Sequence, residues 1–236
     1  MGKEKRRRRS RQTRRAEATR SRILTAARTV FSEKGLDLTG IEDITERADV
    51  GKGTFYYHFE SKEAVINVLV EEMLSGLVAL IDENCAESRD LYDLLDKLIG
   101  AHIAFFSNRW EDFVLFFQGR SDLALTEGYS GMETPFLGYL ERIEALIASV
   151  LKAHLPQTVL RRIACAVAGF VSGYYGFAAV ASAEEDVDQA FRALRGAMVA
   201  GLVRFVQETQ SLEKREKEKI ENERSADHGG ENQGDG

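Results

Sequence analysis

Cysteine and proline are scarce in this chain of 236 residues, and each shortage narrows the class of protein. The two cysteines, Cys85 and Cys165, lie far apart without a second cysteine or histidine at metal-ligand spacing, so we expect neither a disulfide framework nor a metal site. The two prolines, Pro135 and Pro156, leave long stretches in which helices can continue. Alternating apolar runs bounded by Asn-Gly or Asp-Gly turns are missing as well. The sequence therefore predicts an all-α fold.

Motifs of known enzyme classes are also absent. The chain has no phosphate-binding P-loop, no Gly-x-Ser-x-Gly, no His-Glu-x-x-His and no Cys-x-x-Cys. An enzyme therefore lacks support, and we expect no catalytic residue and no cofactor. The N-terminus is charged without an apolar segment behind it, so we expect no signal peptide and a cytoplasmic protein.

Positive charge is concentrated at one end of a chain whose formal net charge is −6. Residues 1–22 hold 11 lysines and arginines against two glutamates, whereas the rest of the chain holds 21 basic and 36 acidic residues. The local sign of charge decides which partners a surface attracts. We expect residues 1–15 to form a disordered basic arm that contacts DNA phosphates, rather than only a solvated tail.

One uncharged run offers an alternative. Residues 163–183 contain no charge and are long enough to span a bilayer. The run is rich in alanine, glycine and serine, and Tyr174 and Tyr175 stand in its middle, where a spanning helix would favour leucine and isoleucine. We therefore favour a buried helix at a subunit interface and expect no membrane partner.

Three helices are expected near the N-terminus, and the second and third are short. Apolar residues recur at helical spacing from Ala16 to Lys34, and Gly35 is a typical C-cap. Thr39 to Glu42 has the form of a capping box, with Thr39 as N-cap. A turn and a third helix within Val50–Lys62 complete a helix-turn-helix, the geometry that places a second helix in the major groove.

The third helix carries the candidate DNA contacts. Phe55 and Phe59, four residues apart, are expected in the core. Tyr56 could be partly core, and a lone His58 is more often a packing or capping residue than a ligand. Contacts to phosphate position a protein without naming a base. The residues predicted to bind DNA are Thr39, Lys52, Gly53, Thr54, Tyr56, Tyr57, His58 and Lys62.

The combined spacing of these residues is distinctive. It joins Arg22-Ile23-Leu24, Ala26-Ala27, Phe31, Gly35, Thr39, Ile44 and then Val50 to Lys62. Over residues 17 to 65 this order resembles the DNA-binding half of the TetR family of bacterial transcriptional regulators. Gly40 departs from the usual pattern, where a second hydroxyl is common, and so removes one phosphate contact. Thr45 stands where alanine is common and crowds the packing of two helices.

The resemblance implies a two-part molecule. Residues 16–60 would form a three-helix DNA-binding domain, and residues 61–210 a helical domain that binds an effector and dimerises. Residues 211–236 are charged and then glycine-rich, and we expect a flexible tail. The family also implies a homodimeric repressor that leaves a palindromic double-stranded operator when a small apolar or aromatic effector binds. The alternative is a DNA-binding regulator whose second domain only dimerises.

Small residues mark the expected dimer interface. They recur along one face of each of the last two long helices, which permits close helix packing between two subunits. The alternative is close packing within one chain. The predicted interface residues are Ala168, Gly169, Ser172, Gly176, Ala193, Ala197 and Gly201.

Aromatic residues are dense in the middle of the chain. They suggest an apolar effector pocket, although a helical core can use large residues simply to fill space. An effector that fits one conformation better would shift the separation of the DNA-binding domains, and the helix after Ser61 is the expected connection. The predicted pocket residues are His102, Phe106, Trp110, Phe113, Phe117, Tyr139 and Tyr174.

Overall fold

The computed structural model describes residues 2–107, 109–122, 133–181 and 187–229, and within these ranges every regular element is a helix. The side chains of residues 2–11, 110, 119–122, 133, 175–181, 187–193, 221 and 223–229 lie outside the description. The all-α prediction is confirmed. In chain order the helices are α1 (Gly2–Lys34), α2 (Ile41–Arg47), α3 (Lys52–His58), α4 (Lys62–Cys85), α5 (Leu91–Phe106), α6 (Trp110–Asp122), α7 (Glu133–Val150), α8 (Gln157–Ala181) and α9 (Val187–Gly229).

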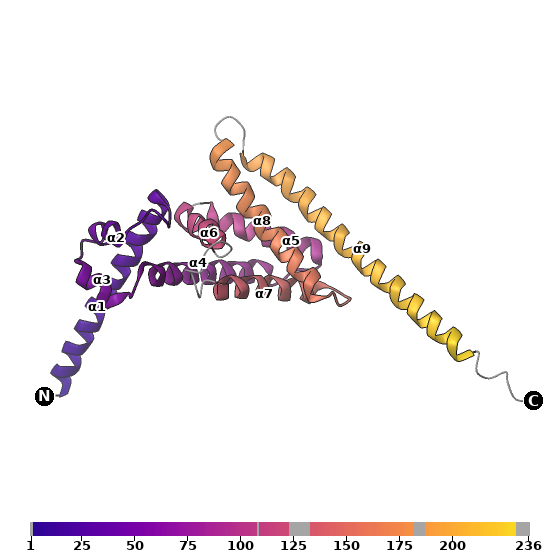
Figure 1. Cartoon of the computed structure of the whole chain (residues 1–236), viewed down its shortest axis with the longest axis horizontal. Helices are drawn as coiled ribbons and strands as arrows, with labels where there is room; N and C mark the ends of the chain where they lie inside the picture. The colour runs from indigo at the N-terminus through magenta and orange to yellow at the C-terminus, as the bar shows by residue number, and fades with distance from the viewer. Residues whose placement is uncertain (1, 108, 123–132, 182–186, 230–236) are drawn as a thin grey trace, which may run out of the picture.

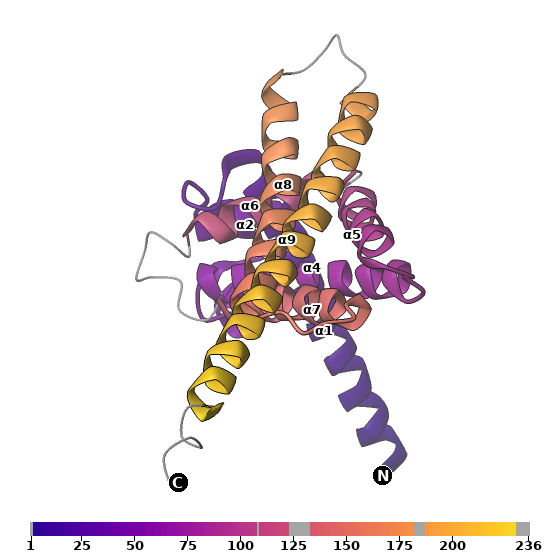
Figure 2. The ribbon, with the colours of Figure 1, turned by 90° about the vertical axis from the view of Figure 1, so that its right-hand side faces the viewer.

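The helices form a small head and a larger body (Figure 1). The head comprises α1, α2 and α3 at the N-terminal end, and α4 leads from it into the body. In the body, α4 packs against α5, α6 and α7, and α7 packs against α8. The last helix, α9, crosses beside α8 and continues well past the body (Figures 1 and 2).

Two residues with a left-handed backbone conformation end helices in the head. Gly35 ends α1 with φ of +83°, a conformation that glycine adopts without a Cβ clash. Asp49 follows α2 with φ of +50°, and the amides of Asp49 and Val50 donate to the carbonyls of Glu46 and Thr45. This is a Schellman ending, and it turns the chain sharply into α3.

The start of α2 differs from the capping box that the sequence predicts. Gly40, not Thr39, is the N-cap, so the helix begins one residue later than expected. The Asp43 carboxylate accepts from the Gly40 amide at 2.9 Å, in the place predicted for Glu42. Glu42 is thereby free to contact α3.

The first helix also corrects the prediction of a disordered arm, because α1 begins at Gly2. Residues 2–15 contain no proline or β-branched residue except Thr13, and their arginine, lysine and glutamine are good helix formers. They extend the helix that the apolar spacing begins at Ala16, and Figure 1 shows this half of α1 projecting from the head.

Ser61 starts α4 as predicted, since its hydroxyl accepts from the Ala64 amide at 3.2 Å. By length and composition alone, α4 is the one helix among the described residues that could cross a membrane, with a mean hydropathy of 1.9. Its apolar side chains recur in the core, including Leu69, Leu77 and Ile81. This is the pattern of a helix at the centre of a bundle.

The C-terminal tail is another correction, because α9 continues through residue 211 as far as Gly229. Acidic and basic residues four apart favour this extension, and two such pairs form among the side chains of α9 that the structure describes: Arg204 with Glu208 at 2.8 Å and Lys214 with Glu218 at 3.8 Å. Nearer its start, Arg195 anchors α9 to α5 through Asp96 at 2.5 Å.

Candidate nucleic-acid interface

The third helix presents two opposite faces. Phe55 is fully buried and Phe59 is 5% exposed, so both belong to the core, as their spacing predicts. Tyr56 and Tyr57 are 55% and 79% exposed, which is unusual for aromatic side chains unless they meet a partner. The Tyr57 ring lies perpendicular to the half-buried His58 ring, at 5.0 Å between centroids.

The entry to α3 is equally open. Lys52, Gly53 and Thr54 are exposed, and a Cβ added at Gly53 would meet nothing within 4 Å. The structure therefore gathers Lys52, Gly53, Thr54, Tyr56 and Tyr57 on one short, solvent-facing helix.

Two predicted DNA contacts occupy different positions. Thr39 is only 2% exposed, and its hydroxyl donates to the Gly35 carbonyl at 2.7 Å. The Thr39 side chain is therefore unavailable to a phosphate, which corrects that prediction. Lys62 is half-buried and donates to the Leu36 carbonyl at 2.8 Å, so it ties α4 to the end of α1 in this structure.

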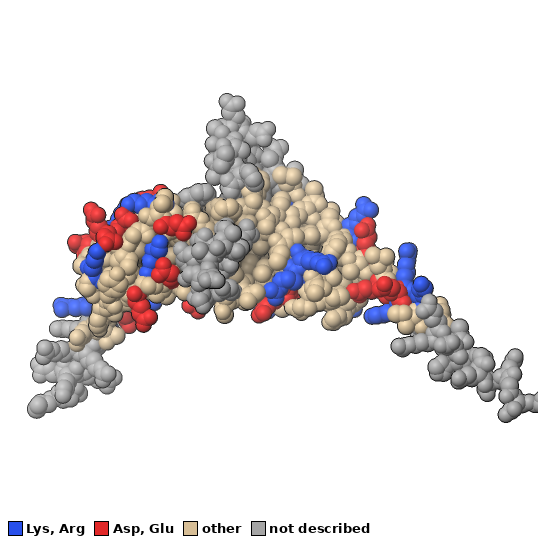
Figure 3. Space-filling view, in the orientation of Figure 1, with Lys and Arg blue, Asp and Glu red and all other residues tan. Residues whose placement is uncertain are grey.

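Charge within the head is balanced, as the mixed surface in Figure 3 illustrates. Residues 20–62 hold seven lysines and arginines and seven acidic residues. Each of these cations already has an intramolecular partner: Arg20 the Phe59 ring, Arg22 the Ala48 and Asp49 carbonyls, Arg28 Asp112, Lys34 Asp43, Arg47 Glu33, Lys52 Glu42 and Lys62 the Leu36 carbonyl. The excess positive charge lies in the first half of α1.

Arg22 is a structural residue that spacing alone does not identify. Its guanidinium donates to the carbonyls of Ala48 and Asp49, at 2.5 and 2.8 Å. Cations near a helix C-terminus stabilise the exposed carbonyls there. Arg22 therefore fixes the turn that aims α3.

An ion pair and two hydrogen bonds join the head to α6. Arg28 on α1 pairs with the buried Asp112 at 3.0 Å, and the Thr29 hydroxyl donates to Glu111 at 3.1 Å. Burial raises the pKa of Asp112, an effect that Arg28 and Arg109 oppose. Gln118 accepts from the Leu36 amide at 2.9 Å, beside the Gly35 turn. The head thus contacts the body through α6 as well as through α4, the connection that the sequence predicts.

His102 and Tyr139, both predicted effector contacts, bind one another in the body. His102 is fully buried; its Nδ1–H donates to the Leu98 carbonyl at 2.7 Å, and Nε2 then accepts from the Tyr139 hydroxyl at 2.6 Å. Burial lowers the pKa of His102 to about 4, so the ring is neutral near pH 7. His102 is thus a packed core residue that can act on a ligand only through Tyr139.

The other predicted pocket residues differ in how deeply they are buried. Phe106 and Phe113 are buried and meet edge to face at 5.8 Å, whereas Phe117 stacks on Phe113 at 6.0 Å and is 38% exposed. Tyr174 is half-buried against the core. The Trp110 side chain lies outside the description.

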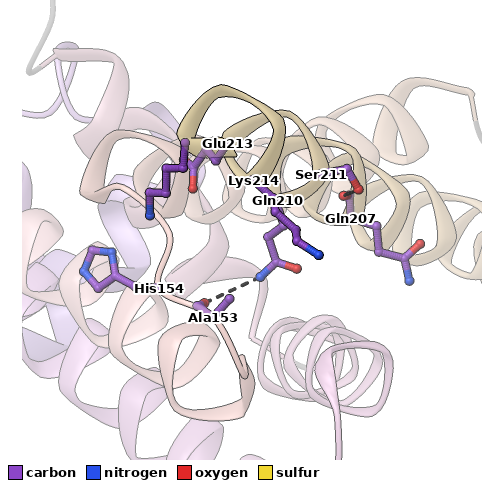
Figure 4. Close-up of a pocket in the computed structure, with 8 residues that line it drawn as sticks. Ala153, His154, Gln207, Gln210, Ser211, Glu213 and Lys214 are labelled. Atoms are coloured by element: carbon purple, nitrogen blue, oxygen red, sulfur yellow. Dashed lines mark hydrogen bonds between the residues drawn. The ribbon is translucent and has the colours of Figure 1, made fainter. Parts of the chain in front are cut away.

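Two hollows open on the part of the body that the structure describes. One, of about 270 Å³, lies between α4 and α7 and reaches Leu74, Val78, Pro135 and Tyr139. The other, of about 520 Å³, lies between the α7–α8 connection and the extension of α9 (Figure 4). Its lining is polar, with His154, Gln210 and Lys214 among its residues, so it does not match the apolar pocket that the sequence predicts.

The predicted dimer residues also divide between two faces. Ala168 and Ser172 are buried within their own chain, which corrects their placement. Gly169, Ala197 and Gly201 are exposed, and a Cβ at either glycine would meet nothing within 4 Å. The side chains at Gly176 and Ala193 lie outside the description. On α9 the exposed face also carries Leu194, Phe205 and Leu212, which spacing did not single out.

The head therefore defines a helix-turn-helix DNA-binding protein. Residues 23–69 match the family model described as "Bacterial regulatory proteins, tetR family". The "Uncharacterized HTH-type transcriptional regulator YvdT" of Bacillus subtilis is 32% identical over 133 residues, 56% of this chain and 67% of that protein. The chain belongs to the TetR family of transcriptional regulators.

Other relatives are similar over less of their length or in fold alone. The "HTH-type transcriptional repressor KstR2" of Rhodococcus jostii is 32% identical over 80 residues, which cover 34% of this chain and 39% of that repressor. The structure of "FadR from Bacillus subtilis in complex with stearoyl-CoA" has a TM-score of 0.59 at 19% identity. It covers 78% of this chain and 97% of FadR.

Proposed function

We propose that this protein is a dimeric repressor that binds a near-palindromic operator and leaves it when a small apolar or aromatic effector enters the body. The observation that carries the proposal is the exposed tyrosine pair on α3, held by a buried phenylalanine pair on its other face. Such a helix end offers rigid hydroxyl donors to phosphates. The KstR2 relative is itself named a repressor.

The distribution of charge supports different roles for α1 and α3 in DNA binding. The head between residues 20 and 62 has no net excess of lysine and arginine over acid, whereas residues 3–15 carry nine cations against Glu4. Because α1 is continuous from Gly2, the segment that carries these cations projects from the head as part of one unbroken helix. In the proposed complex the first half of α1 supplies attraction to phosphates and α3 supplies the contacts that fix register.

Two copies of the chain would meet through the exposed faces of α8 and α9. Gly169, Ala197 and Gly201 leave room for a second backbone, and the flanking Leu194 and Phe205 supply apolar area. A twofold dimer places two copies of α3 about 34–36 Å apart on successive turns of the major groove. An operator with inverted half-sites follows.

The α4–α7 hollow supports the effector part of the proposal. It is lined partly by apolar side chains and reaches Tyr139, whose hydroxyl holds His102. A ligand that enlarges this hollow would move α4, which starts in the head. It would also move α6, which packs against α4 and holds both Arg28 of α1 and Leu36, just after the end of α1. FadR of Bacillus subtilis, similar in fold, was solved with stearoyl-CoA.

The competing function is a regulator whose body only dimerises. Both functions predict that the protein retards the DNA beside its own gene in a gel shift. Apolar and aromatic compounds that raise Tm in a thermal-shift screen should then release that DNA. Retardation with no releasing compound would favour the competing function, and no retardation would contradict both.

A further inference from the structure

Glu42 lies against Lys52, the first residue of α3. Its carboxylate accepts a hydrogen bond from the Lys52 ammonium, and the two side chains are 67% and 58% exposed. This contact lowers the pKa of Glu42, so the carboxylate stays ionised near neutral pH. A strong donor and a strong acceptor therefore stand side by side at the start of α3.

A carboxylate in this place opposes simple attraction to phosphates. Non-specific DNA binding depends on unpaired cations, and Glu42 partly neutralises the only lysine or arginine within α3. Exposed ion pairs contribute little to folding stability, so stabilisation is a weak reason to place an acid here. Base recognition is a better reason for an acid at this position. A carboxylate accepts hydrogen bonds, and a base can donate one whereas a phosphate cannot.

The edge of a G·C base pair matches such a donor–acceptor pair. In the major groove guanine presents two neighbouring acceptors, N7 and O6, and cytosine then presents the N4 amino donor. An ammonium has three donors and can meet both guanine acceptors, while the carboxylate accepts from cytosine. In an A·T pair the amino donor stands between two acceptors, so the same arrangement loses a contact.

We infer that Glu42 and Lys52 act as one base-reading pair that selects a G·C base pair at one position of each half-site. This inference rests on the proposed DNA-binding function. Lys52 donates to guanine, and Glu42 accepts from the amino group of its cytosine. The N-terminal residues of a recognition helix contact base edges, and Lys52 is the first residue of α3.

Selection from a random-sequence duplex pool tests the pair, because the pool contains every candidate half-site. The full-length protein should enrich an inverted repeat that contains one G·C position per half-site. Glu42→Gln, which keeps the shape but removes the charge, should lower the preference at that position by roughly tenfold, and Lys52→Met should do the same at the same position. Glu33→Gln is the matched control, since Glu33 pairs with Arg47 between α1 and α2, and it should leave every preference unchanged.

Four results would overturn the base-reading pair: the two variants alter different positions, they change affinity equally for all sequences, they leave every base preference unchanged, or the shared position prefers A·T. If the wild-type protein enriches an inverted repeat and neither variant changes its base preferences, the base-reading pair is wrong and the proposed function stands. If it enriches no sequence, the proposed function fails first. Tm of each variant, expected to match the wild type, confirms folding.

Discussion

At the scale of single residues, Tyr57 carries the strongest prediction for DNA binding. It is 79% exposed and projects from a helix whose other face is locked by Phe55. Tyr57→Ala should lower operator affinity about tenfold, because a hydrogen bond to a charged group contributes roughly 1.5 kcal/mol or more. Fluorescence anisotropy titration measures this, with Tyr92→Ala as control, since Tyr92 is exposed on α5 of the body. Equal affinity of Tyr57→Ala and wild type would remove Tyr57 from the interface.

The buried His102 ring should make the free energy of unfolding depend on pH. Its pKa is about 4 in the folded protein against 6.5 as the ordinary value, because burial disfavours the charged ring. A histidine with a lowered pKa contributes stability that is fully present above pH 6.5. As pH falls from 6.5 towards 4, the free energy of unfolding drops by about 3 kcal/mol. Urea unfolding at pH 7 and pH 4.5 should show this loss, and His102→Gln should reduce it. The same slope in both proteins would assign the loss to other groups.

Residues whose role depends on local spacing could be predicted from the sequence. Phe55 and Phe59 are four apart and face the core, and Ser61 caps the helix that follows it. Residues whose partner comes from a distant segment could not be predicted. Neither the carbonyl of Leu36 for Lys62 nor Tyr139 for His102 can be inferred from neighbours in the chain.

At the scale of helices, α1 is the element whose length matters most. Deletion of residues 2–15 should weaken DNA binding and reduce the slope of log affinity against log salt, since each neutralised phosphate contributes about 0.9 to that slope. Titrations across a series of salt concentrations measure the change. Truncation after Glu213 removes a charged segment of α9 instead and should leave the slope unaltered. A slope that survives the α1 deletion would show that this half of the helix stays off the DNA.

Both α1 and α9 are longer than the sequence predicts, and for the same reason. Runs of charge suggest a solvated, disordered chain, yet arginine, lysine and glutamate are also good helix formers. Each run directly continues a helix that already has an apolar face, so no new nucleation is needed. The contact of α6 with α1 escaped prediction because it depends on tertiary packing around Asp112 and Gln118.

At the scale of the whole molecule, the dimer is the main expectation. Gly201→Glu should dissociate it, because the glycine faces open space in one chain and the new charge would be buried between two. Sedimentation analysis measures the loss. Gly138→Glu on α7 is the matched control, since that glycine is also open, and it should remain dimeric. A dimeric Gly201→Glu would place the interface elsewhere.

Two α3 helices of one dimer are expected to read a symmetric site on DNA. Sequencing the DNA that the wild-type protein selects from a random duplex pool tests this most directly. We expect an inverted repeat whose half-site centres lie about 10 base pairs, or a multiple of that, apart. Enrichment of a single asymmetric site, or of no sequence at all, would contradict it.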